Sequence, residues 1–124
     1  MTNPNKRRGT AWESDIVRYL RDQGHDDARR VAQTGRLDIG DIHVGPVVIE
    51  AKNTRTIDLA GFVDQAEREA GHTALPYGVA VVKRRGKNAA HGYAVMSLAA
   101  FSQVIAELKK LKKLRALPDV GTDN

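Results

Sequence analysis

Three side chains with complementary chemistry lie close together in the sequence. Asp41 and Glu50 are carboxylates with eight residues between them, and Lys52 follows Glu50 after one residue. Two carboxylates suit a hard divalent cation such as Mg²⁺, which takes one or two protein ligands and keeps positions for water and a phosphate oxygen. The cation would polarise the phosphoryl group and acidify water, while Lys52 would orient that water or stabilise developing negative charge. The spacing predicts metal-assisted hydrolysis of a phosphodiester bond.

A β-hairpin would bring these side chains together. The segment 37–52 contains two β-rich runs around a Gly-Pro pair, which is typical of a turn. Successive side chains of a strand point to opposite faces, so Glu50 and Lys52 share one face and lie about 7 Å apart. The turn fixes the register, and Asp41 is predicted to lie near the level of Glu50. Two facing carboxylates repel each other, so a positive charge is required between them.

The residues alone leave two questions open: which aspartate is the metal ligand, and whether these charges form a site at all. Asp38 competes with Asp41 for the ligand role; three residues apart on a strand, the two carboxylates point to opposite faces unless a bulge forms at Gly40. We favour Asp41 for its pairing with Glu50, which leaves Asp38 as a supporting group or part of a second metal position. The alternative is an exposed hairpin on which all these charges are ordinary surface groups.

Two further polar residues lie on predicted helices next to the hairpin. Glu13 lies one turn into the first helix, from which its carboxylate can reach over the sheet toward the same metal. The four residues from Thr10 to Glu13 also match a capping box, in which the glutamate bonds the N-cap amide, so both roles stay open. Gln65, on the helix after the hairpin, is either an ordinary exposed residue or a catalytic one that contacts the attacking water or a phosphate.

The pattern of apolar residues predicts the elements around the hairpin. Helical spacing predicts three helices, at residues 10–24, 57–71 and from 97 onward. β-rich runs predict four strands, at 37–44, 47–52, within 77–85 and within 92–97. Thr10 and Ser97 are expected to cap the first and last helices, and residues 25–36 fit either a helical turn or an edge strand at 31–33. The order predicts an α/β fold of mixed α+β type, with a central mixed sheet flanked by helices.

The length and composition predict one globular domain over residues 1–124. The chain is 41% hydrophobic and 28% charged but 5% aromatic, so aliphatic side chains must supply most of the core. Residues 1–8 are expected to form a mobile basic arm and residues 116–124 a mobile tail. The sequence has no cysteine, no signal-peptide pattern and no long apolar run, which predicts a soluble cytoplasmic protein without disulfides or membrane spans.

An excess of basic residues favours a polyanionic partner. Lys and Arg number 20 against 15 Asp and Glu, which gives a formal net charge of +5 and a pI near 9.7. Binding to phosphates releases counterions, so DNA suits this balance, although surface cations also serve solubility. The side chains expected to grip the DNA backbone are Arg7, Arg8, Arg36, Arg55, Lys83, Arg84, Arg85 and Lys87. The lysines of the last helix either bind DNA as well or keep the chain soluble.

The sequence lacks the residue patterns that other classes of reaction require. The four histidines show no metal-binding spacing, and neither GxxxxGK[ST] nor GxGxxG occurs. There is no cysteine nucleophile, and the serines lie in predicted helical or capping positions. These patterns argue against zinc chemistry, nucleotide hydrolysis and nucleophilic catalysis.

The whole arrangement resembles a known nuclease superfamily. An early helix with Glu13, a hairpin reading Asp41-x8-Glu50-x-Lys52 and a later helix with Gln65 are similar to the PD-(D/E)xK nucleases. Within them, the small size and the segments "KRRGTAWE" and "GDIHVGPVVIEAKN" resemble the Holliday junction resolvases of archaea and bacteriophages. The likeness covers most of the chain, although a glycine stands where the superfamily name has proline.

The resemblance implies a fold, a cofactor and a substrate. It implies a restriction-endonuclease-like core, dependence on Mg²⁺ or Mn²⁺, and a homodimer that cuts four-way DNA junctions during recombination and repair in a prokaryotic or phage-infected cell. It makes Asp41, Glu50 and Glu13 metal ligands and Lys52 the catalytic lysine, and Thr34 stands where many archaeal members have a serine before the aspartate. Two alternatives stay open: another nuclease of this superfamily, acting on flaps, ends or duplex, or a non-catalytic basic DNA-binding protein.

Overall fold

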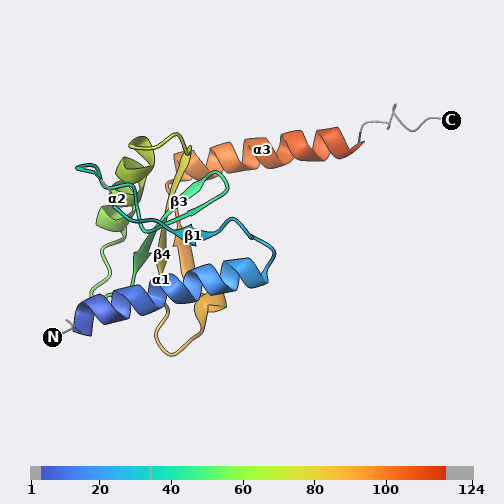
Figure 1. Cartoon of the computed structure of the whole chain (residues 1–124). Coiled ribbons are helices and arrows are strands. Elements are labelled where there is room, and N and C mark those ends of the chain that lie inside the picture. Colours follow the sequence, from blue (N-terminus) through green and yellow to red (C-terminus); the bar gives the residue numbers. More distant parts are fainter. Residues whose placement is uncertain (1–3, 34, 117–124) are drawn as a thin grey trace.

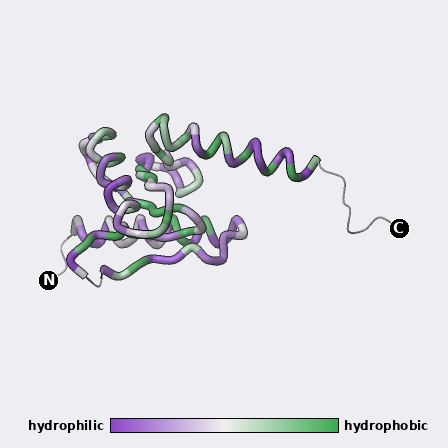
Figure 2. The backbone as a smooth tube through the Cα atoms, turned by 90° about the horizontal axis from the view of Figure 1, so that it is seen from above, coloured by the Kyte–Doolittle hydropathy of each residue, from purple (hydrophilic) through white to green (hydrophobic). Residues whose placement is uncertain are grey.

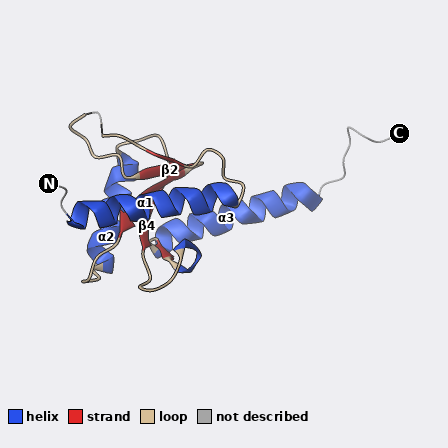
Figure 3. Cartoon of the chain, turned by 60° about the horizontal axis from the view of Figure 1, so that its bottom comes forward, coloured by secondary structure: helices blue, strands red, loops and turns tan. Residues whose placement is uncertain are grey.

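The structure, a computed structural model, describes residues 4–33 and 35–116. Its elements follow in the order α1 (Pro4–Asp22), β1 (Arg29–Arg30), β2 (Ile42–Val44), β3 (Val47–Lys52), α2 (Leu59–Gly71), β4 (Tyr77–Val82), the 3₁₀ turn η1 (Ala89–His91), β5 (Tyr93–Val95) and α3 (Leu98–Ala116). Within these residues the chain is a mixed α+β fold, in which helices flank one five-stranded sheet (Figures 1 and 3). The predicted fold class is confirmed.

The sheet runs in the spatial order β1-β2-β3-β4-β5 and is mixed. Strands β1, β2 and β3 pair antiparallel, β3 and β4 pair parallel, and β5 returns antiparallel to β4. The parallel pair needs a crossover, which α2 supplies. The predicted hairpin of β2 and β3 is confirmed, and the segment left open contributes the edge strand β1, at Arg29–Arg30 rather than at 31–33.

The first predicted strand of the hairpin is shorter than expected. It begins at Ile42 and not at residue 37. Gly40 has a φ of +90°, and its amide donates to the Asp38 carboxylate at 3.0 Å, so the chain turns before it enters the sheet. A side chain at Gly40 would also overlap Val48, so only glycine fits this turn.

Helix α1 covers one face of the sheet and holds most of the core. Trp12 and Ile16 are buried against Ile42 and Ile49, and the Trp12 indole donates to the Val81 carbonyl at 3.1 Å. These sheet residues share one face because they alternate with residues pointing the other way. The buried tryptophan fixes how α1 lies across the sheet.

The predicted start of α1 is wrong. The helix begins at Pro4, six residues before Thr10, so Thr10 is an interior residue and the capping-box role of Glu13 is excluded. Proline suits the first turn of a helix because it lacks an amide hydrogen that this turn leaves unpaired. Residues 4–8, expected in a mobile arm, are helical, and residues 1–3 lie outside the described part of the chain.

Helix α2 covers the opposite face of the sheet. Asp58 caps it by accepting from the Gly61 amide at 3.0 Å. Gly78 of β4 has no side chain to hold the helix away, and a Cβ there would overlap the Ala66 carbonyl. This close approach brings the polar side chains of α2 down onto β3.

Helix α3 extends away from the body, as Figures 1 and 2 show. The predicted cap is confirmed, because Ser97 Oγ accepts from the Ala100 amide at 3.1 Å. None of the 19 residues of α3 is buried, and its leucines are exposed, Leu98 by 80% and Leu114 by 62%. The helix ends at Ala116, and the remainder of the predicted tail lies outside the described residues.

Among the described helices, none combines the length and the apolar content that crossing a bilayer requires.

Candidate active site

The hairpin places Asp41 beside Glu50. Ile42 pairs with Ile49, and the Asp41 amide donates to the Ile49 carbonyl at 3.0 Å, so Asp41 continues the ladder opposite Glu50. Asp41 Oδ2 accepts from the Ala51 amide at 2.8 Å, which fixes the carboxylate over β3. The side chains of Asp41 and Glu50 lie within hydrogen-bonding reach of each other. The predicted proximity of these two carboxylates is confirmed.

Gln65 connects Lys52 to Glu50. Lys52 Nζ donates to Gln65 Oε1 at 2.7 Å and lies 3.8 Å from Glu50 Oε2. Gln65 Nε2 donates to Glu50 Oε2 at 3.3 Å. The amide therefore sits between the strand pair and α2 and holds the ammonium group of Lys52 in place. The structure thus places Gln65 in the cluster, so Gln65 is not an ordinary exposed residue.

Glu69 is a cluster member that the sequence reasoning missed. It is 1% exposed, and its Oε2 accepts from Gln65 Nε2 at 3.5 Å. Glu69 Oε1 is buried and has no hydrogen-bond partner. The available signal was the spacing of Gln65 and Glu69, four residues apart on one helical face. Nothing in the sequence placed this face of the helix over Glu50, so the sequence analysis did not single out Glu69.

Asp38 belongs to the other end of the cluster. Its carboxylate reaches Glu69, and its carbonyl accepts from Nδ1 of His72, a residue that sequence reasoning did not single out, at 2.6 Å. Asp41 is thus the aspartate beside Glu50, and Asp38 is the aspartate beside Glu69. The turn at Gly40 makes this possible, since it lets both side chains face the same region.

Two carboxyl groups of the cluster, those of Glu50 and Glu69, hold protons more strongly than free carboxyl groups do. Burial raises the pKa of Glu50 to about 9, and the charges of Asp41 and Glu69 add to the effect while Lys52 opposes it. Burial also raises the pKa of Glu69 to about 8, helped by its hydrogen bond to Asp38. The same hydrogen bond is the main reason that the pKa of Asp38 is lowered. The protein supplies too little positive charge for all these groups to ionise together.

Glu13 lies at the margin of the cluster, on the α1 side. Its Oε1 is 3.4 Å from Arg30 Nε on the edge strand. Burial raises the pKa of Glu13, the charge of Asp41 raises it further, and Arg30 lowers it. The side chain of Glu13 is therefore near Asp41 but already paired with Arg30. This makes Glu13 a weaker candidate for a metal ligand than Asp41 and Glu50.

The donor set fits a hard divalent cation. Asp41 and Glu50 offer converging carboxylate oxygens, and the unpartnered Glu69 Oε1 lies in the same cluster. Among the described residues, no group of three or more His, Cys, Asp or Glu side chains is placed to hold a metal ion. Two carboxylates are enough for Mg²⁺ or Mn²⁺, because water and a substrate phosphate fill the remaining positions. A cation there would supply the positive charge that the carboxylates lack.

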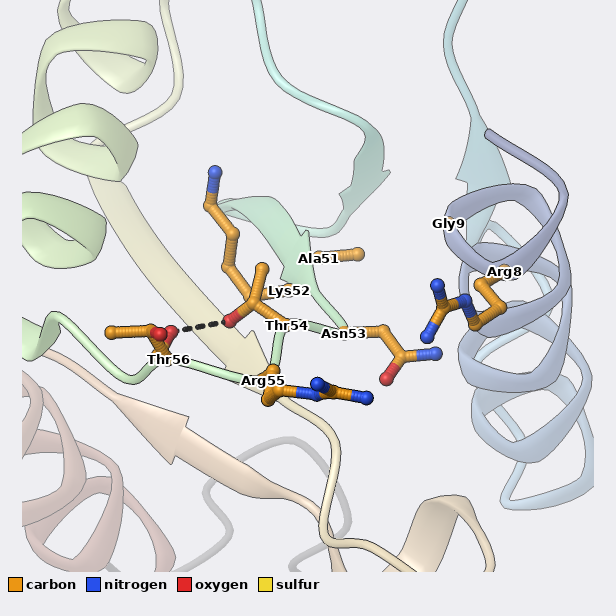
Figure 4. A pocket seen from close by; sticks show the side chains of 8 residues that line it. All are labelled: Arg8, Gly9, Ala51, Lys52, Asn53, Thr54, Arg55 and Thr56. Carbon is orange, nitrogen blue, oxygen red and sulfur yellow. Dashed lines mark hydrogen bonds between the residues drawn. The ribbon is translucent and has the colours of Figure 1, made fainter. Parts of the chain in front are cut away.

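An open groove leads to Lys52; we name it the basic groove. It has a volume of about 720 Å³, and its lining residues are Arg8, Gly9, Ala51, Lys52, Asn53, Thr54, Arg55 and Thr56. Figure 4 shows Arg8 of α1 and Arg55 of the loop after β3 extending into the opening from opposite sides. Thr54 Oγ donates to the Thr56 carbonyl at 2.8 Å and shapes this loop. The groove is open enough for a phosphodiester backbone.

The other predicted DNA-contacting residues divide into two sets. Arg55, Lys83, Arg84 and Arg85 line a second groove. The ammonium group of Lys83 lies 5.0 Å from the centre of the ring of Trp12, which does not line this groove. Arg7, Arg36 and Lys87 are exposed and line neither groove, and Thr34 lies outside the described residues.

No protein-family model, curated protein or solved structure matches this chain. The chemistry of the site therefore follows from its own geometry. Carboxylates that need a cation, a held ammonium group and a groove lined by guanidinium groups together suit an anionic substrate with a phosphate at Lys52.

Proposed function

We propose that this protein is a divalent-metal-dependent DNA endonuclease, and specifically a Holliday junction resolvase. The observation that carries the proposal is the convergence of Asp41, Glu50 and Lys52, of which Lys52 also lines the basic groove. The pairing of acidic groups with a held lysine is the chemistry that phosphodiester hydrolysis requires. The choice of a four-way junction rests on the sequence resemblance to resolvases.

Each residue of the cluster has a role in this mechanism. Asp41 and Glu50 would hold Mg²⁺ or Mn²⁺, which polarises a phosphoryl oxygen and lowers the pKa of water. Lys52 orients the attacking water and stabilises negative charge on the phosphate. Gln65 positions Lys52 through its 2.7 Å hydrogen bond, and Glu69 in turn fixes the Gln65 amide. Glu13, on the α1 side of Asp41, is a further candidate ligand.

A homodimer forms part of the proposal. Cutting a junction at two symmetric positions needs two equivalent active sites, which a twofold dimer supplies. The exposed apolar stripe of α3, formed by Leu98, Phe101, Ile105, Leu108, Leu111 and Leu114, is a surface that a second copy can cover. The basic residues of α3 lie in the second half of the helix. If the α3 helices of two copies pair antiparallel, the basic half of each lies beside the uncharged half of the other.

A cleavage assay tests the proposal. Wild type should cut a synthetic four-way junction with Mg²⁺ and leave it whole with EDTA. Asp41→Asn and Glu50→Gln should lower the rate by at least about a hundredfold while DNA binding persists. The matched control is Glu67→Gln, which removes an exposed carboxylate from the same helix as Gln65.

The same assay separates the alternatives. Cutting of flaps, ends or linear duplex in preference to the junction would identify another kind of nuclease. If every DNA structure stays whole and binding is indifferent to EDTA, the protein is a binding module and the proposal is wrong.

A further inference from the structure

The second groove combines an apolar floor with a basic rim; we name it the aromatic groove. It has a volume of about 620 Å³ and lies on the α2 face of the sheet, beyond the N-terminal end of that helix. Its lining residues are Thr54, Arg55, Ile57, Leu59, Val82, Lys83, Arg84, Arg85, Tyr93 and Val95. Tyr93 is 54% exposed, and Ile57 and Leu59 are similarly open to water. An exposed apolar surface of this kind marks a binding site.

The aromatic groove lies next to the candidate active site. Lys52 pairs with Val82, and Val82 pairs with Tyr93, so these three side chains project from one face of neighbouring strands. Two strand spacings separate Lys52 from Tyr93, which is about 10 Å. Thr54 and Arg55 line both grooves. A strand of DNA with a phosphate at Lys52 therefore reaches Tyr93 within one or two nucleotides.

The charges at the rim of the aromatic groove indicate which kind of molecule it binds. Within the described residues, Arg55, Arg84 and Arg85 form no ion pair with a carboxylate, so their charges are available to an anion from outside. Tyr93, which is 54% exposed, adds an aromatic ring to the same lining. A flat apolar group joined to a phosphate matches both features, and that combination is a nucleotide.

We propose that the aromatic groove binds an unpaired nucleobase, stacked on Tyr93, with its phosphate held by the arginines. This inference rests on the proposed nuclease function and adds a source of substrate selectivity. Bases within a duplex are stacked on their neighbours and do not offer a free face, whereas bases at a branch point can leave the stack. The groove would therefore favour branched or locally unpaired DNA over continuous duplex.

Binding measurements on single-stranded and duplex DNA test this inference. Fluorescence anisotropy is recorded in EDTA with a labelled oligothymidine and with a labelled duplex. Tyr93→Ala should weaken binding of the oligothymidine by about tenfold and leave duplex binding unchanged, because stacking is lost. Tyr93→Phe should retain wild-type binding. Tyr19→Ala, which removes an exposed tyrosine from α1, is the matched control and should change neither affinity.

Several results would overturn the inference. Unchanged oligothymidine binding by Tyr93→Ala, or an equal loss on both DNA forms, would show that no base stacks there. A change in oligomeric state in sedimentation, with intact DNA binding, would show that the groove receives a second copy. If wild type still cuts junctions, these results leave the proposed function standing. If wild type neither binds nor cuts DNA, both proposals are wrong. Circular dichroism confirms that each variant is folded.

Discussion

Glu50 and Glu69 are the residues whose protonation most directly affects the stability of the fold. Both are buried beside other carboxyl groups, and a single ammonium group, that of Lys52, lies in contact with Glu50. Keeping a buried carboxylate ionised requires compensation, so in the absence of a cation the fold retains protons instead. Proton binding by these two groups in the metal-free protein therefore affects both the charge of the site and the stability of the fold.

The pKa of Glu50 predicts how stability depends on pH. Its pKa in the folded protein is raised from 4.5 to about 9, so the folded state binds more protons than the unfolded state between these values. This contribution to the free energy of unfolding is fully present below about pH 4.5 and is lost as the pH rises toward 9. Urea unfolding of wild type and Glu50→Gln, without metal, measures it. The variant should be the more stable protein at about pH 9, and the difference should vanish as the pH falls below about 4.5. A constant difference would contradict the assignment.

Gln65 offers a second prediction about a single residue. Gln65→Met keeps the length of the side chain but removes the amide that holds Lys52. The rate of junction cleavage should fall by about ten- to a hundredfold, the usual effect of losing a positioning partner, while DNA affinity stays the same. Asp64→Asn, an exposed neighbour on the same helix, should cut at the wild-type rate. Equal rates for Gln65→Met and wild type would remove Gln65 from the mechanism.

The elements show what could be predicted from the sequence. The hairpin was predictable because a Gly-Pro turn and alternating residues fix its register locally, and Asp58 and Ser97 begin their helices through local hydrogen bonds. The start of α1 was not, because the capping-box match at Thr10 competes with a helix that begins at Pro4. Contacts that form only in the folded chain, such as that of Glu69 with Glu50, have no local signal in the sequence, so Glu69 was missed.

Helix α2 makes a prediction of its own through Gly78. A side chain at this position would overlap the Ala66 carbonyl, so Gly78→Ala must push α2 away from the sheet. Overpacking of this kind costs about 1–3 kcal/mol in the free energy of unfolding, and the displaced Gln65 should also slow cleavage. Gly71→Ala, at the end of the same helix where a Cβ meets open space, should change neither property. Urea unfolding and the cleavage assay measure both variants.

The whole molecule is a compact body with one projecting helix, and this shape predicts self-association. Each of the six residues of the stripe on α3 is at least 38% exposed within its own chain, so two copies gain hydrophobic burial by pairing along it. Sedimentation equilibrium should find a dimer for wild type and a monomer for a variant with both Leu108→Glu and Leu111→Glu. Circular dichroism should show that this variant stays folded, because neither leucine packs on the body. Lys112→Glu serves as the control on the same helix. A wild-type monomer, or a double variant that stays dimeric, would contradict this role of α3.

Direct titration with Mn²⁺ near pH 7.5 examines the metal site without DNA. Calorimetry should show binding by wild type with release of protons, because Glu50 must ionise to accept the cation. The released protons appear as heats that differ between buffers of unequal ionisation enthalpy. Glu50→Gln should show no binding, and Glu67→Gln should bind as wild type does. Absence of binding by wild type, or equal binding by Glu50→Gln, would contradict a cation site formed by Asp41 and Glu50.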